Sequence, residues 1–277
     1  MKKILLILLS LSAVLFSACG EVKYEFKNGI MYADGKKATG TFEFKVGSGN
    51  KGKGRFVNGI PDGIFERYYS NGNLMAKDII SNGNILKDEV YFENGQIMFD
   101  LSSEKGFSLF FDDGQLVMIS DFQTEEISNY YENGNPLLVT SRRAKRILYS
   151  EDKEVLSKME NEILVDVGTT LKPLDDGSFE ILKDNKLVGK IANNGTETYF
   201  YSTGEKLMIY DPIARDTEIF FKNGNTFYKR NNETAKYFYK DGKIFFEAYR
   251  GQWRFFDREG KEMVTNSDNI TDIKKID

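Results

Sequence analysis

Few residues of this chain have the types and spacing that catalysis or metal binding requires. The 277-residue sequence contains no histidine, which excludes His-based triads and His metal ligands. The segment Gly47–Gly54 is rich in glycine and lysine, but its spacing departs from that of a phosphate-binding loop, and we interpret it as a hairpin loop. Nothing distinguishes one pair among the 42 acidic residues. We therefore predict a protein that is not an enzyme and uses no cofactor or metal.

The only cysteine, Cys19, closes a segment with the zones of an export signal. Lys2 and Lys3 precede an apolar run from Ile4 to Phe16, and small residues follow. The run is too short to span a bilayer. A lone cysteine allows no intramolecular disulfide and no cysteine metal cluster. The alternative interpretation is an incidental cysteine in an ordinary secretory signal.

The position of Cys19 resembles the lipobox of bacterial lipoproteins, although Phe16 stands where that pattern usually has Leu. The resemblance implies that residues 1–18 are a lipoprotein signal peptide, that Cys19 is acylated, and that residues 19–23 form a short tether. Gly20 then implies sorting to the cell outer membrane. Because more than one acyl chain anchors a protein stably, the predicted protein is held at the bacterial cell envelope by its N-terminal lipid.

The charge balance argues against nucleic acid as a partner. The formal net charge is −4, whereas a nucleic-acid-binding chain usually carries a basic patch. Four basic residues do cluster, and we interpret them as solvated surface, the alternative being an anion site. They are Arg142, Arg143, Lys145 and Arg146.

A short cassette recurs along most of the chain: two aromatic residues, one or two polar residues, then glycine. Such internal repetition is typical of repeat proteins. Examples occupy residues 68–72, 91–95, 130–134, 220–224 and 237–242.

The turn residues of the cassettes predict β-hairpins. Asn-Gly pairs favour two-residue type I′ turns, in which both residues need positive φ, and stretches rich in Tyr, Phe, Ile and Val lie between them. The spacing of the turns predicts another at Asp152-Lys153. It also favours strand over helix for the segment from Val155 to Val165, so the predicted fold class is all-β.

The segment 56–74, which reads FVNGIPDGIFERYYSNGNL, resembles a bacterial MORN-repeat variant. The match is good over residues 54–140 and 197–262 and weak over residues 141–196, where the aromatic pair is lost. The resemblance implies an elongated antiparallel meander of stacked β-hairpins that serves in binding or scaffolding. We expect a single repeat domain over residues 24–262, followed by a polar C-terminal tail over residues 263–277.

Two adjacent aromatics put apolar residues on both faces of a sheet. We call the third residue before the glycine the inner-index residue and the fourth the outer-index residue. With a two-residue turn, Tyr69 would pair with Leu74 on one face and Tyr68 with Met75 on the other. The outer-index pairs are apolar on both strands throughout, so we assign them to the core.

The inner-index aromatics then form the candidate binding face, because rows of exposed aromatics are typical of binding surfaces. The alternative is that both faces are buried, or that aromatics near turns only stabilise their own hairpins. The candidate residues are Tyr69, Phe92, Phe111, Tyr131, Tyr201, Phe221 and Tyr239.

Three classes of function follow from these observations. The first is a lipid-anchored, non-catalytic binding or scaffold module with a protein or glycan partner. The second is an antitoxin or immunity-like protein, since some MORN-variant proteins carry that description. The third is an enzyme, since MORN repeats accompany a lipid kinase domain elsewhere, but no kinase motif is present.

Overall fold

The computed structural model describes residues 22–46, 49–142, 145–161, 163–250, 252–263 and 270–277. The predicted signal peptide, Cys19, part of the tether, part of the Gly-rich loop and Arg143 lie outside the described residues.

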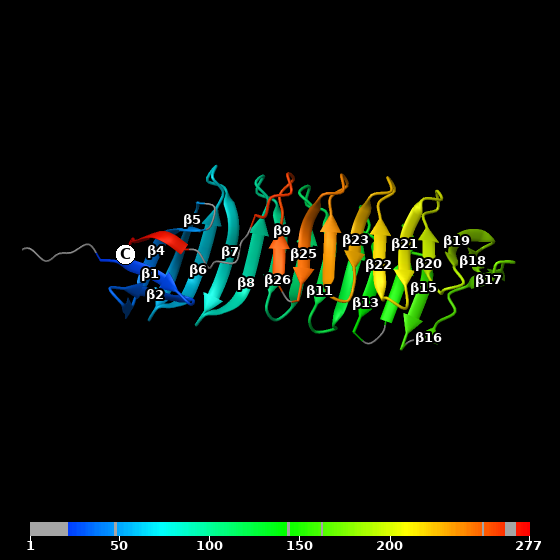
Figure 1. The fold of residues 1–277 in the computed structure, drawn as a ribbon, viewed down its shortest axis with the longest axis horizontal. Coiled ribbons are helices and arrows are strands. Elements are labelled where there is room, and N and C mark those ends of the chain that lie inside the picture. Colours follow the sequence, from blue (N-terminus) through cyan, green and yellow to red (C-terminus); the bar gives the residue numbers. More distant parts are fainter. Residues whose placement is uncertain (1–21, 47–48, 143–144, 162, 251, 264–269) are drawn as a thin grey trace, which may run out of the picture. The chain divides into compact units, whose positions relative to one another are not determined.

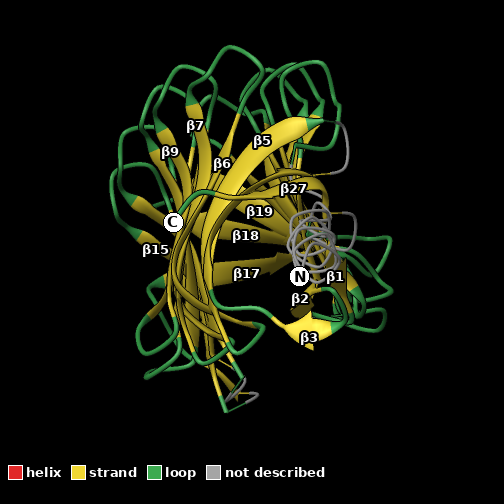
Figure 2. Ribbon diagram, turned by 90° about the vertical axis from the view of Figure 1, so that its left-hand side faces the viewer, coloured by secondary structure: helices red, strands yellow, loops and turns green. Residues whose placement is uncertain are grey.

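Figure 2 shows that the described part of the chain consists of β-strands joined by turns and loops, with no helix. Consecutive strands pair antiparallel, which confirms the predicted all-β meander of hairpins. The segment after Val155 forms strands β15 and β16, as predicted. A membrane-crossing helix is not found among the described residues.

The chain divides into two compact units. Unit 1 comprises Met1–Arg67, Ile79–Asn84 and Ser267–Asp277, and unit 2 comprises Tyr68–Asp78 and Ile85–Asn266. Each unit has its own cluster of buried apolar side chains, which is the physical reason for the division. Strands β7 (Leu74–Ser81) and β8 (Asn84–Tyr91) contribute residues to both units.

Unit 1 contains a three-stranded sheet and the strand series β27-β4-β5-β6. Its core is aromatic: Phe42 and Phe56 are fully buried and meet edge to face, with ring centroids 5.7 Å apart. Gly52 and Gly54 on β5 leave room for the rings of Phe44 and Phe65, which a Cβ would meet within 2.3 Å. The strands are β1 (Tyr24–Lys27), β2 (Ile30–Ala33), β3 (Lys36–Lys37), β4 (Gly40–Val46), β5 (Asn50–Val57), β6 (Ile60–Tyr68) and β27 (Ile270–Lys275).

The predicted polar tail is not free of the fold, because residues 270–275 form β27. Ile270 pairs with Val46 on β4, and the backbone N–H of Thr41 donates to Asp277 Oδ1 at 2.8 Å. Ile270 and Ile273 pack against the core of unit 1. These two isoleucines stabilise the pairing in a segment whose composition is otherwise polar.

The N-terminal sheet of unit 2 runs in chain order from β8 to β16. Each strand pairs with the next one along the sequence, so every connection is a hairpin. The strands after β8 are β9 (Ile97–Ser102), β10 (Gly106–Phe110), β11 (Leu116–Asp121), β12 (Glu126–Tyr130), β13 (Pro136–Ser141), β14 (Lys145–Tyr149), β15 (Val155–Glu160) and β16 (Ile163–Leu164).

The C-terminal sheet of unit 2 runs from β17 to β26, also in chain order. The weak repeats at residues 141–196 also form antiparallel hairpins. The strands are β17 (Thr169–Pro173), β18 (Phe179–Lys183), β19 (Lys186–Ile191), β20 (Glu197–Phe200), β21 (Lys206–Asp211), β22 (Asp216–Phe220), β23 (Thr226–Arg230), β24 (Thr234–Phe238), β25 (Ile244–Tyr249) and β26 (Gln252–Phe255).

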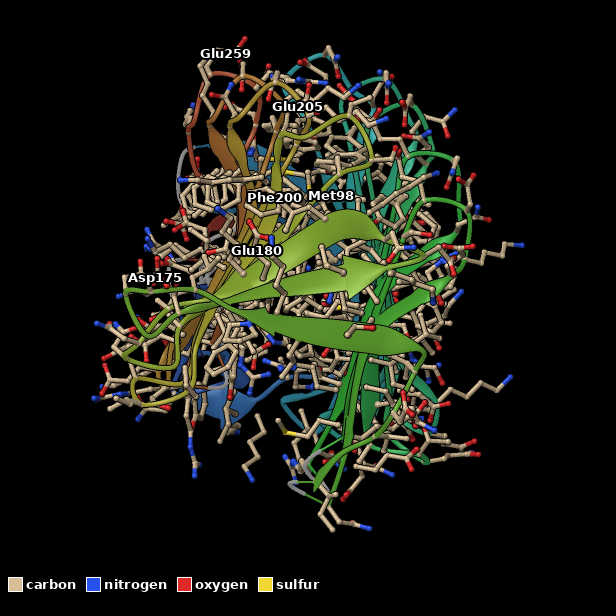
Figure 3. The ribbon with its side chains drawn as sticks, turned by 90° about the vertical axis from the view of Figure 1, so that its right-hand side faces the viewer. Met98, Asp175, Glu180, Phe200, Glu205 and Glu259 are labelled. Atoms are coloured by element: carbon tan, nitrogen blue, oxygen red, sulfur yellow. The ribbon has the colours of Figure 1, made fainter. Side chains whose placement is uncertain are left out.

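The two sheets of unit 2 pack face to face around one core. In Figure 1 the yellow and orange C-terminal strands lie over the green N-terminal strands. Phe99 on β9 is fully buried, and its ring centroid lies 5.1 Å from those of Trp253 and Phe255 on β26. Figure 3 shows the side chains, including the labelled Met98, between the sheets. Unit 2 is therefore a β-sandwich made by folding one series of hairpins back over another.

Candidate binding sites in unit 2

Each cassette forms a three-residue hairpin loop and not the predicted type I′ turn. The backbone N–H of Phe92 donates to the carbonyl of Gln96 at 2.8 Å, and that of Gly95 donates to the carbonyl of Phe92 at 2.9 Å. Only Gly95 has positive φ, at 84°, as in a type I turn followed by a glycine bulge. The side chain of Asn94 accepts from the N–H of Gln96 at 3.0 Å, which stabilises the longer loop.

The type I′ turn does occur elsewhere in the chain. Asn58 and Gly59 both have positive φ, as do Asn82 and Gly83. The predicted turn at Asp152-Lys153 is also present, with Lys153 in the left-handed region at φ 68° where other cassettes have glycine.

The longer loop changes which face each residue occupies. Val90 pairs with Phe99 and Tyr91 with Ile97, so Met98 is an extra residue in a β-bulge. Met98 and Phe99 are both fully buried, although they are neighbours in sequence. The same bulge recurs in the equivalent hairpins of both sheets.

The predicted assignment of faces is right for one strand of each hairpin and wrong for the other. The outer-index partners after the glycine, such as Met98, Val117 and Leu137, are buried as predicted, whereas the aromatic members of those pairs are not fully buried. The inner-index aromatics point into the sandwich, and the outer-index aromatics lie half-buried on its outer faces, because a register change of one residue exchanges the faces. The described inner-index residues do not form the expected row of exposed aromatics. Most of them are buried, as the alternative interpretation predicted. Phe92, Tyr131, Tyr201, Phe221 and Tyr239 are buried, while Tyr69 and Phe111 are half-buried.

Buried tyrosine hydroxyls connect successive hairpins. The hydroxyl of Tyr131 donates to the carbonyl of Tyr149 at 2.7 Å, and that of Tyr201 donates to the carbonyl of Phe220 at 2.7 Å. Burial raises the pKa of Tyr131 and of Tyr201 well above the ordinary value for a phenol. Both hydroxyls therefore stay protonated and act as donors at neutral pH.

Ion pairs join the cassette turns of the two sheets. In each pair, an acidic residue of the N-terminal sheet bonds to a basic residue of the C-terminal sheet. Each of these residues stands two positions before the glycine of its own cassette, or before Lys153, which takes the place of the glycine. The pairs are Asp112–Arg258 at 2.7 Å, Glu132–Lys240 at 2.6 Å and Glu151–Lys222 at 2.7 Å.

At this position the cassettes of the N-terminal sheet carry an acidic residue and those of the C-terminal sheet carry a basic one. The sequence contains this difference, but it was not among the predicted signals. It could have predicted that the early cassettes face the late ones. The pairs are partly exposed, so each contributes modestly to stability, but together they select one alignment of the sheets.

A pocket of about 250 Å³ opens at this turn edge, between the two sheets. Four predicted site residues, Phe111, Tyr131, Tyr201 and Phe221, line it with Leu137 and Phe227. The ring centroids of Tyr131 and Tyr201 lie 6.3 Å apart, and those of Phe111 and Phe221 lie 6.4 Å apart. Tyr69, Phe92 and Tyr239 do not line the pocket.

The rim of the pocket is polar and its charges are already paired. Glu151 bonds to Lys222 and Glu132 to Lys240, and Lys222 also lies over the Tyr201 ring, 5.5 Å from its centroid. A pocket with aromatic walls and a paired rim suits an apolar group. No metal-binding cluster of His, Cys, Asp and Glu occurs among the described residues.

The basic cluster does not behave as one solvated patch. Arg146 is buried between the sheets, and its Nη2 bonds to both carboxylate oxygens of Glu197, at 2.8 and 2.6 Å. Tyr199 donates to the same carboxylate at 3.0 Å, and the guanidinium lies 3.9 Å from the centroid of Tyr210. The interpretation as surface is thus wrong for Arg146.

Comparison with known proteins identifies one repeat. Residues 61–82 match the family model described as MORN repeat variant. No curated protein sequence matches the chain.

Solved structures resemble the chain weakly. The TCP10 domain of Danio rerio CPAP, in complex with a peptide of Danio rerio STIL, is 19% identical, with 73% of this chain and 97% of that chain covered and a TM-score of 0.25. The G-box domain of the microcephaly protein CPAP is 18% identical, with 60% and 96% covered and a TM-score of 0.26. The chain thus carries a MORN repeat variant at residues 61–82, within an all-β fold of consecutive hairpins.

Proposed function

We propose that this chain is a non-catalytic binding module of the bacterial cell envelope. A lipid on Cys19 holds it at the outer membrane, and the pocket at the turn edge of unit 2 receives an apolar side chain of a partner protein. The observation that carries this proposal is the convergence of Phe111, Tyr131, Tyr201 and Phe221 on one opening with a charged rim.

The chemistry of the pocket favours a protein partner over a glycan. Sugar hydroxyls need hydrogen-bonding groups that are free to turn toward them, whereas the rim carboxylates of Glu132 and Glu151 are paired with lysines. The volume is below the roughly 300–1,000 Å³ of sites for drug-sized ligands, so it suits one anchoring side chain.

Filling the pocket from its rim should abolish binding without disturbing the core. Glu132 is 46% exposed, so Glu132→Trp places a ring at the opening. We expect indole, titrated as a probe, to shift the NMR signals of the Leu137 methyl groups with a Kd on the order of millimolar. Glu132→Trp should weaken that binding at least tenfold.

The chain provides two controls for this experiment. Glu93→Trp changes the same cassette position outside the pocket, and Glu132→Gln removes the ion pair without filling the space. Both variants should bind indole with the affinity of the wild type. Both should also crosslink to the same envelope proteins as the wild-type chain does. Equal binding by Glu132→Trp, or larger shifts with N-acetylglucosamine than with indole, would contradict the proposed protein site.

Acylation of Cys19 is tested separately by mass spectrometry of the mature N-terminus. We expect the chain to begin at Cys19 with a mass increase equal to the attached lipid, because the lipobox resemblance predicts processing there. Cys19→Ala should leave the precursor unprocessed. A mature chain that begins at another, unmodified residue would end the lipoprotein interpretation without affecting the pocket.

A further inference from the structure

A second cavity lies between the two sheets of unit 2, at the strand ends away from the cassette turns. Its volume is about 430 Å³, and it is lined by the ends of β11 and β13 and by Arg230 at the end of β23. The pocket at the turn edge lies at the other ends of β13 and β23, where Leu137 and Phe227 line it. The sandwich therefore has an aromatic opening at one edge and a polar opening at the other.

Small side chains on the N-terminal sheet leave room for this cavity. Met118 on β11 and Leu138 on β13 are buried in the interior. Two residues further along these strands, Ser120 and Thr140 occupy the same face and line the cavity, with Ile127 between them in the register. Because side-chain volume falls here, the two sheets do not fill the space between them, and two hydroxyl groups reach the cavity.

Arg230 enters the cavity from the C-terminal sheet. It pairs with Ala235 on β24, and Ala235 pairs with Ala248 on β25. Both alanines pack against the core, so this row of the register faces the interior. Burial raises the pKa of Tyr228, and the nearby charge of Arg230 opposes that rise. The guanidinium group of Arg230 is thus directed between the sheets, although part of its side chain is exposed at the opening.

Arg142 supplies a second guanidinium group from the N-terminal sheet. It directly follows β13 and lines the same cavity. Among the described residues, neither Arg142 nor Arg230 forms an ion pair with a carboxylate, whereas Arg250 at the same edge is paired with Glu233 at 2.7 Å. The cavity therefore holds two positive charges that no described acid neutralises by direct contact.

Two acidic residues also line the cavity, and they differ in what they can do there. Asp121 Oδ1 accepts the backbone N–H groups of Thr124 and Gln123, at 3.0 and 2.7 Å, which lowers the pKa of Asp121. Because Asp121 follows Ser120 on β11, strand alternation directs its side chain toward the outer face. Glu125 is exposed at the same turn, so it is the acid that a bound anion would meet.

We propose that this cavity binds a small molecule that carries two negative charges on phosphate or carboxylate oxygens. The guanidinium groups of Arg142 and Arg230 face the charged oxygens, and the hydroxyls of Ser120 and Thr140 donate to others. The volume of about 430 Å³ falls within the roughly 300–1,000 Å³ of small-molecule sites. The basic cluster of the sequence thus contributes Arg142 to an anion site, which is completed by an arginine of the other sheet.

NMR titration of the full chain tests this site, with inorganic phosphate and succinate as probes at an ionic strength held constant with NaCl. The methyl groups of Ile127 report on this cavity, and those of Leu137 report on the pocket at the turn edge. We expect a probe to shift the Ile127 signals with a Kd on the order of millimolar and to leave Leu137 unchanged. Phosphate carries its charges on one group and succinate on two, so the tighter probe identifies the ligand chemistry.

Substitutions at the cavity should change the affinity in opposite directions. Arg142→Gln and Arg230→Gln should each weaken binding at least about tenfold. Glu125→Gln should strengthen binding severalfold, because it removes a like charge near the anion. Arg215→Gln is the matched control, since Arg215 is exposed at the same edge of the C-terminal sheet and does not line the cavity. The fluorescence of Trp253 verifies that each variant folds.

Three results would overturn the anion site. The first is that neither probe shifts the Ile127 signals at about 20 mM, well above the expected Kd. The second is that Arg215→Gln weakens binding as much as Arg230→Gln does, because the response would then reflect overall charge. The third is that Glu125→Gln weakens binding, because the site would then recognise a positive group. Indole binding at the pocket at the turn edge is independent of all three results.

Discussion

Replacement of Arg146 by methionine is expected to destabilise unit 2 by about 3–5 kcal/mol. The substitution leaves the carboxylate of Glu197, whose side chain is only 14% exposed, without its counter-charge. The Tyr199 hydroxyl would remain as its donor, which is too little to offset the loss of Arg146 Nη2, the nitrogen that donates to both carboxylate oxygens. Trp253, the only tryptophan, lies in unit 2, so its fluorescence during urea unfolding reports on this unit.

The double variant Arg146→Met with Glu197→Met separates a buried charge from lost packing. Because it removes both charges, it should recover most of the stability lost in the single variant. Lys145→Met changes the neighbouring, partly exposed member of the basic cluster and should cost no more than about 1 kcal/mol. If the single and double variants are equally unstable, the ion pair is not the reason for the loss.

Phe99→Ala is expected to destabilise unit 2 by about 3–5 kcal/mol, because it opens a cavity where the two sheets meet. Phe99 has no exposed surface, and its ring contacts Phe107 on its own sheet and Phe246, Trp253 and Phe255 on the other. Urea unfolding followed by circular dichroism measures the change, with Trp253 fluorescence as a second signal. Phe99→Leu should recover more than half of the loss, since it keeps most of the apolar volume.

The matched control is Phe220→Ala, which removes an outer-index aromatic that is half-buried on the outer face of the C-terminal sheet. Its cost should be about 1 kcal/mol, because solvent already reaches that ring. Equal losses for Phe99→Ala and Phe220→Ala would show that the interior of the sandwich is not the main core of unit 2.

Much of the local structure could be predicted because turn residues act over a few positions. The all-β meander, the strand after Val155 and the turn at Asp152-Lys153 follow from turn spacing and side-chain type alone. The exact loop did not follow. Asn-Gly suits both a two-residue and a three-residue hairpin, and the choice here rests on a side-chain bond such as that of Asn94 to the N–H of Gln96.

The candidate site was only partly predictable. The sequence predicts Tyr131 and Tyr201 as exposed binding residues. In the structure most of the predicted residues are buried, and Tyr131 and Tyr201 are among those that line the pocket. The error came from one residue of register, which exchanges the faces of a strand. The run of basic residues predicts that Arg146 lies on the surface, although it is buried and Lys145, the residue before it on β14, is partly exposed.

The sequence by itself determined the repeat, the strand class, the positions of the turns and the aromatic character of both faces. These properties depend on residues a few positions apart, so a single chain is enough to show them. Tertiary structure decided which aromatics are buried and that Tyr131 meets Tyr201, because those contacts need the C-terminal sheet to fold back over the N-terminal one. It likewise decided that β27 pairs with β4, where two isoleucines near the C-terminus reach the core of unit 1.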